Sequence, residues 1–323
     1  MGAAQRWGTG VRPLVSIIIV LFNSADYIRS CIKTLALLNY GPFEVVMVDN
    51  GSDDESVRVA RESARTAGLR CIISELSRNR GFAAANNHGF SLSHGDLIVL
   101  LNPDTEVFGD TVGELVEAMR DPEIGVAGCK VYCPDRSTLQ HAGGYIRDNG
   151  LTMHYGADQH DVGQFDEVKD VAYVTGAALA VSRDVFIRAG MLDTGYFPAY
   201  FEETDLCLRV RRLGYRATYV PGARVVHCES TTTGKFTEQY YYLYHRNRIR
   251  FMLKNFSWRF LLDRALPMEQ QWLGMIEPWE QAVPLNKGYL MNIANLPRTL
   301  LARRRMERTL GVPRLEDTVS TLS

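Results

Sequence analysis

The side chains best suited to chemistry in this chain of 323 residues are carboxylates in two short segments. Asp104 ends the sequence Asn102-Pro103-Asp104, and Glu202, Glu203 and Asp205 fall within four positions. A carboxylate at the end of a strand can hold a divalent metal ion, and such an ion can bridge a diphosphate. Each segment also has a purely structural interpretation. Asn-Pro-Asp suits a turn, and three acids complement the dipole of a helix that begins there.

Other polar clusters are spaced along the first third of the chain. They are Asn23, Asp49-Asn50 and Asn79-Arg80-Gly81. No Gly-x-Gly-x-x-Gly follows the first apolar run, and no Gly-x-x-x-x-Gly-Lys-Ser/Thr occurs anywhere. These absences argue against dinucleotide oxidoreductases and P-loop ATPases, so a phosphate would have to be bound in another way.

The clusters follow strands that alternate with helices. Buried strands are expected at Val15–Phe22, Phe43–Asp49, Cys71–Leu76 and Leu97–Leu101, and helices at Tyr27–Leu38, after Asp54 to about Ala67, and at Gly81–Leu92. This alternation predicts βαβ units and a mostly parallel sheet, and such sheets bind ligands at the carboxyl ends of their strands. The three clusters and Asn102–Asp104 all fall at these ends, which favours one common site over four unrelated turns.

The pattern is less regular after Gly125. Strands are expected at Gly125–Val131, Val171–Ser182, Arg216–Val220 and Ala223–His227, with a hairpin near Gly144 and a helix at Leu206–Leu213. From Thr231 the chain is expected to be helical and rich in tyrosine and arginine. We therefore expect an α/β domain over residues 15–230, with halves that meet at residue 105, and a helical extension over residues 231–323.

The overall charge of the chain hides an asymmetry. The formal net charge is -1, but residues 1–230 hold 22 Lys+Arg and 29 Asp+Glu, whereas residues 231–323 hold 14 and 8. No apolar run approaches the ~20 residues that span a bilayer. Residues 1–14 lack the apolar stretch of a secretory signal and are expected to form an exposed arm. Six scattered cysteines suit the reduced thiols of a cytoplasmic protein.

Seven motifs occur in order along the chain: Val15–Asn23, Val48–Asp54, Asn79–Asn87, Leu100–Thr105, Gly176-Ala177, Tyr200–Arg209 and Val226-His227. Together they resemble family 2 inverting glycosyltransferases, and within that family the bacterial rhamnosyltransferase-like group. The resemblance extends to about Phe251. It implies the GT-A fold, an α/β architecture with a Rossmann-like, doubly wound and mostly parallel sheet, here followed by a C-terminal helical extension.

The resemblance assigns the donor site to residues at the strand ends. Asn23, Asp49 and Asn50 match the nucleoside pocket, Asn79, Arg80 and Gly81 match the loop beside the ribose and diphosphate, and Asn102 is expected at the donor as well. Asn50 stands where the family commonly has a carboxylate that accepts from the base, and an amide oxygen can still accept. Arg246 and Arg248 resemble arginines of a Tyr-rich family helix. They could bind the diphosphate or form a solvated face.

The resemblance also assigns the metal, the base and the acceptor. Asp104 matches the last residue of the Asp-x-Asp motif that holds Mg²⁺ or Mn²⁺, and His227 matches a second ligand of some members, although a lone histidine can be structural. Glu203 matches the general base, which is usually Asp, and its extra methylene moves the carboxylate by about 1.5 Å. Glu202, Gly176 and Ala177 are expected beside the acceptor. Asp205 and Arg209, four positions apart, suit an ion pair.

These assignments imply that Glu203 removes a proton from an acceptor hydroxyl, whose oxygen displaces the nucleotide in one step with inversion. The donor is expected to be a dTDP- or UDP-sugar, with rhamnose as the first candidate, and the acceptor a glycan or a lipid-linked glycan. Another sugar, such as galactose or N-acetylglucosamine, and a catalytically degenerate binding module stay open, as does a homodimer. No nucleic-acid partner is expected. A cytoplasmic location is expected, with the Arg303-Arg304-Arg305 segment near anionic lipid or a pyrophosphate-linked acceptor.

Overall fold

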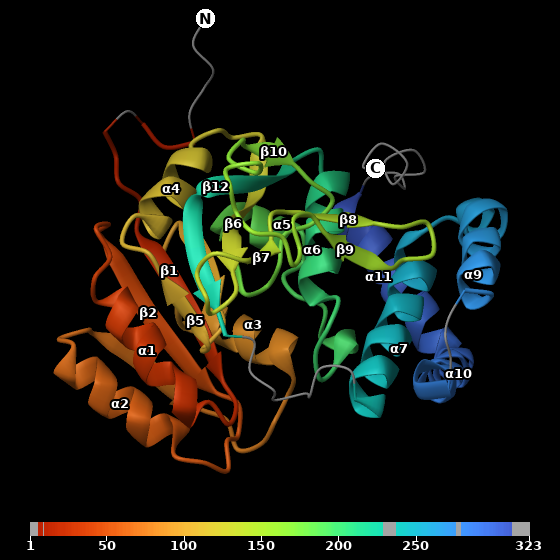
Figure 1. The fold of residues 1–323 in the computed structure, drawn as a ribbon, viewed down its shortest axis with the longest axis horizontal. Coiled ribbons are helices and arrows are strands. Elements are labelled where there is room, and N and C mark those ends of the chain that lie inside the picture. The colour runs from red at the N-terminus through yellow and green to blue at the C-terminus, as the bar shows by residue number, and fades with distance from the viewer. Residues whose placement is uncertain (1–5, 9, 229–236, 276–278, 312–323) are drawn as a thin grey trace, which may run out of the picture.

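The computed structural model describes residues 6–8, 10–228, 237–275 and 279–311. Within these residues, a sheet of ten strands forms the centre of the molecule and helices cover both of its faces (Figure 1). The helices of the C-terminal extension lie at the end of the molecule opposite α1 (Ala25–Leu35) and α2 (Ser56–Thr66).

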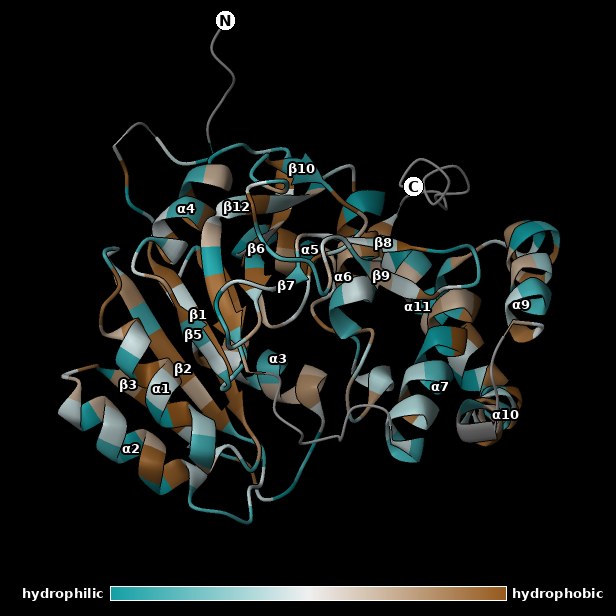
Figure 2. Ribbon diagram, viewed as in Figure 1, coloured by the Kyte–Doolittle hydropathy of each residue, from teal (hydrophilic) through white to brown (hydrophobic). Residues whose placement is uncertain are grey.

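The first part of the sheet is parallel, as the sequence predicts. It holds β1 (Val15–Leu21), β2 (Phe43–Asp49), β3 (Cys71–Glu75) and β4 (Leu97–Leu101) in the spatial order β3-β2-β1-β4. Ile17 and Ile19 of β1 face the core beneath α1 and α2, whereas Ile18 and Val20 face the core that includes α3 (Phe82–Leu92). Both faces of β1 are buried, which explains its unbroken apolar sequence. Figure 2 shows the apolar strands between helices whose outer faces are polar.

The second part of the chain continues the same sheet. β11 (Ala178–Ser182) lies antiparallel between β4 and β6 (Ile124–Tyr132), and β12 (Arg216–His227) runs parallel to β6. β5 (Thr105–Val107), β7 (Leu139–His141) and β10 (Lys169–Asp170) add short antiparallel strands at this end. Because β11 pairs with strands of both parts, the two halves expected to meet at residue 105 form one sheet.

The remaining elements of this part cover the sheet or extend from it. They are α4 (Thr111–Ala118), α5 (Arg183–Arg188), the short helix η1 (Thr194–Tyr196), α6 (Glu202–Arg212), and a hairpin of β8 (Gly144–Ile146) with β9 (Thr152–His154). The hairpin near Gly144 is therefore confirmed. The expected helix, opened by the acidic segment and continuing over Leu206–Leu213, is confirmed too, because α6 begins at Glu202.

Three sequence-based expectations are wrong in detail. Only Ala178–Ser182 of the expected strand Val171–Ser182 is a strand, because Val171 and Ala172 make single hydrogen bonds to the carbonyls of Ala217 and Gly144 and Gly176 lies in a turn. The two short strands expected after Arg216 are one strand, β12, whose register against β6 shifts between Val220 and Arg224.

The N-terminal segment is the third correction. The Arg6 guanidinium donates to the carbonyls of Pro122 (3.0 Å) and Ile124 (2.8 Å), and Trp7 packs against the core. These two residues are therefore not an exposed arm, because a buried row of carbonyl groups binds the arginine. Residues 1–5 and 9 of the expected arm lie outside the described residues.

The C-terminal extension is helical, as expected. It holds α7 (Glu238–Asn255), α8 (Trp258–Phe260), the π-helical turn η3 (Leu261–Ala265), α9 (Leu266–Leu273), α10 (Trp279–Ala294) and α11 (Leu296–Leu310). Phe251 and Met252 of α7 pack in the core on the α6 side of the sheet. The expected boundary after residue 230 lies outside the described residues. In the part of the chain that the structure describes, no helix has the length and apolar character needed to cross a bilayer.

Candidate active site

The loops after β1 and β2 hold each other through short polar side chains. Asn23 Oδ1 accepts from the Asp53 N–H at 2.9 Å, and the Asn23 N–H donates to Ser52 Oγ at 3.0 Å. The buried Asp49 carboxylate accepts from Ser52 Oγ at 2.6 Å and from the Gly51 and Ser52 N–H groups, both at 3.2 Å. Asp49 therefore shapes the loop after β2, and that loop in turn holds Asn23.

The loop after β3 joins this pair through Asn50. Asn50 Oδ1 accepts from the Arg80 N–H at 2.8 Å, Asn50 Nδ2 donates to Asn79 Oδ1 at 3.1 Å, and Asn79 Oδ1 accepts from the Gly81 N–H at 2.8 Å. The structure thus brings together the six residues at the ends of β1, β2 and β3, or in the loops after them, that the sequence assigns to the donor. Their shared feature is a set of amide groups at the carboxyl ends of three adjacent strands.

Gly81 connects this donor rim to the segment before α6. Its φ is +85°, and a Cβ atom there would lie 2.8 Å from Phe197 Cδ2. The next N–H, that of Phe82, donates to the carbonyl of Pro198 at 2.8 Å. Only glycine allows this backbone conformation and this close approach together. A cavity of about 680 Å³ opens beside the contact, lined by residues that include Arg78, Arg80 and Phe197.

The metal-ligand candidates meet at the ends of β4 and β12. His227 Nε2 lies 3.2 Å from Asp104 Oδ1 and 3.3 Å from Asn102 Nδ2, and both Asp104 and His227 are buried. His227 Nδ1 lies 2.7 Å from Gln140 Oε1, a contact that orients the ring with Nε2 toward Asp104. The donor set therefore suits a divalent ion.

Asp104 and His227, called the metal corner below, are connected to the acidic segment Glu202–Asp205 through Gly176 and Ala177. The carbonyl of Ala177 accepts from the Asn102 N–H at 3.0 Å, and a Cβ atom on Gly176 would lie 3.7 Å from Glu203 Cγ. Glu203 therefore packs against Gly176, and the next residue, Ala177, contacts Asn102 beside Asp104. The predicted acceptor residues Gly176 and Ala177 lie between the two predicted chemical groups.

Glu203 is held near the first turn of α6 with a perturbed pKa. Burial raises the pKa of Glu203 to about 7, and the N–H groups of Glu203 and Thr204 lower it in part. Burial raises the pKa of the neighbouring Glu202 well above its usual range, and the charge of Glu203 adds to that shift. Glu203 therefore titrates near neutral pH and can exchange a proton with a bound hydroxyl, while the raised pKa of Glu202 disfavours its charged form.

The backbone before these acids is strained. Tyr200 has a φ of 83° and Phe201 a φ of 77°, both left-handed conformations of residues with large side chains. Each such residue costs of order 1–3 kcal/mol, so the surrounding structure must hold the turn. The turn leads into α6, whose second residue, Glu203, packs against Gly176.

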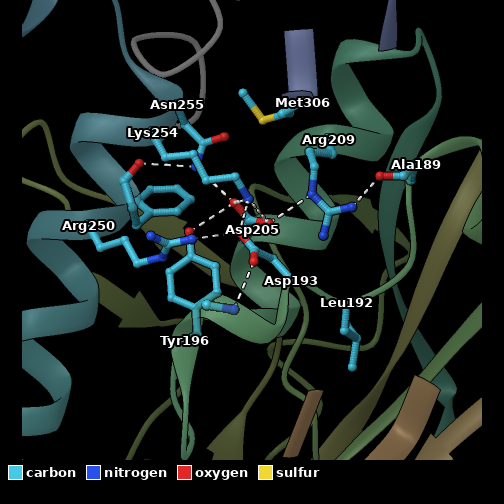
Figure 3. A network of polar contacts seen from close by, with 12 residues as sticks. Ala189, Leu192, Asp193, Tyr196, Asp205, Arg209, Arg250, Lys254, Asn255 and Met306 are labelled. Carbon is cyan, nitrogen blue, oxygen red and sulfur yellow. Dashed lines mark hydrogen bonds and ion pairs between the residues drawn. The ribbon is translucent and has the colours of Figure 1, made fainter. Parts of the chain in front are cut away.

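Residues of α7 hold this turn, and the sequence analysis did not identify them. Asn247 Nδ2 donates to the carbonyls of Tyr196 (2.8 Å), Ala199 (2.8 Å) and Tyr200 (3.0 Å). Lys254, seven residues later and on the same helix face, lies in the network of Figure 3, where its Nζ donates to both oxygens of Asp205 at 2.9 Å. The heptad spacing of Asn247 and Lys254, with the apolar Leu243 and Phe251 on the same helix face, was the signal that could have indicated them.

Asp205 is the centre of that network. Its pKa lies well below its usual range because Lys254 and Arg209 stabilise the charge against the cost of burial. Arg209 Nε donates to Asp205 Oδ2 at 2.8 Å, which confirms the predicted ion pair four positions apart. Asn255 Nδ2 and the Tyr196 hydroxyl donate to Asp205 Oδ1, both at 2.9 Å.

The two arginines assigned to the donor, Arg246 and Arg248, lie in different surroundings. The Arg246 guanidinium donates to the carbonyl of Phe197, which lines the cavity beside Gly81, so Arg246 lies close to the donor rim. Arg248 is fully buried, and its Nη1 and Nη2 donate to the carboxylate of Glu269 in α9 at 2.7 and 2.6 Å. The structure does not bring Arg248 to the donor residues. It corrects that expectation, because the opposite face of α7 packs against the other C-terminal helices.

A mostly parallel central sheet with helices on both faces is the architecture of the GT-A glycosyltransferases. Residues 16–189, just over half of the chain, match the model described as "Glycosyl transferase family 2", and the chain belongs to that family. Glu203, His227 and α7 lie beyond the matched residues, so their roles depend on the geometry described above.

Known proteins are similar to this chain over most of its length. The chain is 24% identical over 280 residues to N-acetylglucosaminyl-diphospho-decaprenol L-rhamnosyltransferase of Mycobacterium tuberculosis, which covers 78% of the chain and 87% of that protein. It is 32% identical over 237 residues to the uncharacterized protein y4gI of Sinorhizobium fredii, covering 71% of the chain but only 26% of y4gI. The chain thus spans about a quarter of that longer relative.

A solved structure shares the fold. The mannosyltransferase PcManGT from Pyrobaculum calidifontis, solved in complex with GDP-Man and Mn²⁺, superposes with a TM-score of 0.59 at 18% identity. The match covers 98% of this chain and 90% of that one. The C-terminal helices are therefore included in the region of structural similarity.

Proposed function

We propose that this glycosyltransferase moves a sugar, rhamnose in the first instance, from a nucleotide-diphosphate donor to a hydroxyl group of a glycan or lipid-linked acceptor, with inversion. One observation carries the proposal: Glu203, whose pKa burial raises to about 7, packs against Gly176 on the rim that also holds Asp104 and His227. A base poised near neutral pH and next to a metal corner suits hydroxyl activation beside a diphosphate.

The donor half supplies neutral hydrogen-bonding groups and one nearby guanidinium. Asn23, Asn50 and Asn79 present amides to the nucleoside, and the N–H groups near Gly81 lie beside them. Arg246, close to the same rim through Phe197, pairs with the negative charge of the diphosphate. These residues orient the donor so that its anomeric carbon faces the acceptor side of the rim.

The acceptor half supplies the proton transfer. Glu203 takes the proton of the acceptor hydroxyl as the oxygen forms its bond to the anomeric carbon, and the bond from that carbon to the diphosphate breaks. The raised pKa of Glu202 disfavours a second negative charge beside the base. No covalent sugar intermediate is needed, so no nucleophilic side chain has to be assigned.

Asp104 and His227 are the residues that would hold a divalent ion. Among the described residues no group of three or more His, Cys, Asp or Glu side chains is arranged to hold a metal, so donor oxygens and water would complete the coordination. When bound, Mg²⁺ or Mn²⁺ neutralises charge on the departing diphosphate. His227→Ala is expected to weaken Mn²⁺ binding by about 10–100-fold, measured by titration calorimetry with nucleotide present. Unchanged affinity would remove His227 from the ligand set.

Rhamnose is the first donor to test because the Mycobacterium tuberculosis relative is named as an L-rhamnosyltransferase. Thermal-shift screening against dTDP-rhamnose, UDP-galactose and UDP-N-acetylglucosamine with Mn²⁺ compares the candidates. A ligand at 100 times its dissociation constant adds about 2.7 kcal/mol of stability, so the true donor should give the largest shift. A larger shift with a UDP-sugar would replace rhamnose by that sugar.

The decisive test of the reaction is Glu203→Gln. The substitution keeps the shape and removes the base, so turnover is expected to fall by about 10²–10⁴-fold while donor binding is retained. Glu114→Gln, a change of the same kind in α4, is the matched control. Full turnover by Glu203→Gln would overturn the base assignment, and a wild-type protein that binds donor without transferring or hydrolysing it would be a degenerate binding module.

We also propose that the outer face of α11 contacts the lipid bilayer that holds the acceptor. The outer face of α11 holds Leu301, which is 54% exposed, and the exposed Arg298, Arg304, Arg305 and Arg308. The only acid of α11, Glu307, pairs with the buried Arg303 at 3.5 Å. Among the described residues none of the four exposed arginines forms an ion pair. A basic helix face with apolar side chains suits an anionic bilayer surface and places the enzyme at the cytoplasmic face.

Vesicle sedimentation tests this surface. Replacing Arg304, Arg305 and Arg308 by glutamine is expected to abolish sedimentation with phosphatidylglycerol vesicles. The same replacement of Arg58, Arg61 and Arg65 in α2 should leave it intact. Equal sedimentation of the α11 variant and the wild type, or equal binding to neutral vesicles, would contradict the proposal.

A further inference from the structure

We propose that α7 is part of the catalytic apparatus and that Asn247 is a positioning residue, which sets the turn from which Glu203 reaches the acceptor hydroxyl. The inference rests on the proposed role of Glu203 as the base. It extends that role to a helix outside the residues that match the family model.

Both polar atoms of the Asn247 side chain have hydrogen-bond partners, and these partners fix the orientation of the amide group. The side chain is fully buried, and its Nδ2 lies within 3.0 Å of three carbonyl oxygens, those of Tyr196, Ala199 and Tyr200. Its Oδ1 accepts from Arg246 Nε at 3.1 Å and Nη2 at 3.0 Å. Three carbonyl oxygens on one side require the amide nitrogen there, so the orientation of the group is fixed by its partners.

The segment that Asn247 binds would not keep its shape by itself. Tyr200 and Phe201 both have left-handed φ values, which large L side chains avoid. The carbonyl of Tyr200 is one of the three that Asn247 binds, and Glu203 follows three residues later. A hydrogen-bond donor from another helix therefore stabilises the strained conformation at the point where it turns into α6.

The other side of Glu203 is tied to the same helix. Asp205, two residues after the base, receives hydrogen bonds from Lys254 Nζ and Asn255 Nδ2 (Figure 3). Lys254 Nζ also donates to Asp193 at 2.6 Å, before the turn begins. Contacts from α7 thus lie on both sides of Glu203, and a displacement of α7 would move the base.

The donor loop meets this turn as well. The Phe82 N–H donates to the carbonyl of Pro198, within the segment whose carbonyls bind Asn247. The turn is therefore fixed between α3, which begins at the donor rim, and α7. A misplacement of about 1 Å can cost about 10²-fold in rate. This arrangement therefore determines whether the Glu203 carboxylate lies at the correct distance from the donor.

The test uses Asn247→Asp, which keeps the size but puts an oxygen against three carbonyl oxygens. The rate of the chemical step, measured in single turnover with donor and Mn²⁺, is expected to fall at least tenfold. The Kd of the nucleotide should stay within about twofold, because the contacts of Asn23, Asn50 and Asn79 are untouched. Asn247→Ser, which keeps one donor and adds no charge, should lose less activity than the aspartate.

Two comparisons separate positioning from general stabilisation. Glu269→Gln is the matched control, since it weakens the buried contact of the neighbouring Arg248 without touching the turn. It should lower Tm and leave the single-turnover rate unchanged. In a Glu203→Gln background, Asn247→Asp should add less than about a threefold further loss, because a residue that acts only by positioning the base has nothing left to position.

The outcomes are distinguishable. If Glu203→Gln is fully active, the proposed base is wrong. If Glu203→Gln is inactive but a folded Asn247→Asp, with the wild-type circular dichroism spectrum, keeps its rate, the inference about α7 is wrong and the base stands. If Asn247→Asp does not fold, Asn247→Ser decides: a normal rate in that variant contradicts the inference. A full multiplicative loss in the double variant also contradicts it.

Discussion

The donor rim and the catalytic turn of this glycosyltransferase are held in different ways. At the rim, Asn23, Asp49 and Asn50 are held by hydrogen bonds to loops at the ends of adjacent parallel strands. The turn that carries Glu203 is strained and is held by side chains of α7, a helix from outside the α/β part of the chain. A binding site can thus be built from strand ends alone, whereas the geometry of the base depends on a distant segment.

The largest expected effect comes from the buried charges that join α7 to α6. Lys254→Met leaves Asp205 buried with one cation fewer, so the free energy of unfolding should fall by about 3–5 kcal/mol. Lys287→Met breaks the exposed pair with Glu238, which should cost about 0–1 kcal/mol. Urea unfolding measures both. Equal stability of the two variants would show that the Asp205 network does not hold the extension to the α/β part.

The next largest effect is a difference in pH dependence between the catalytic rate and nucleotide binding. Glu203 works as a base only when it is deprotonated, and burial raises its pKa to about 7. The rate of the chemical step should therefore rise with pH up to about 7 and fall about tenfold per pH unit below it. Nucleotide binding at the amide-lined rim should change little over the same range. A rate that declines only below about pH 4.5, the ordinary glutamate range, would mean that Glu203 is solvated or is not the base.

The smallest effect is confined to the rim. Asn50→Ala removes the contacts with the Arg80 N–H and with Asn79, which should cost about 1 kcal/mol and raise the nucleotide Kd about fivefold. The single-turnover rate with saturating donor should be unchanged, because Asn247 and Lys254 still hold the catalytic turn in this variant. The exposed Asn286 of α10 provides a control position for the same substitution. A large loss of rate in Asn50→Ala would mean that the two regions are not independent.

Local sequence patterns determined most of the fold and the donor rim. Apolar runs such as Val15–Leu21 and the helical spacing between them predict parallel βαβ units, and parallel strands must place their carboxyl ends at one edge. For that reason Asn23, Asn50 and Asp104 could be assigned to one rim without a structure. The motif Glu202–Asp205 could likewise be assigned to the start of a helix.

Only the tertiary structure decided how the base is held and which arginine lies near the donor. Arg246 and Arg248 are two positions apart, so their side chains point about 200° apart around α7, and the packing of the helix determines that Arg246 faces Phe197 while Arg248 is buried against Glu269. The pKa of Glu203 depends on burial by segments distant in sequence. The role of Asn247 depends on three carbonyl groups of a turn that no local pattern places beside it. Such contacts form between segments that are distant along the chain, and a pattern of neighbouring residues carries no information about them.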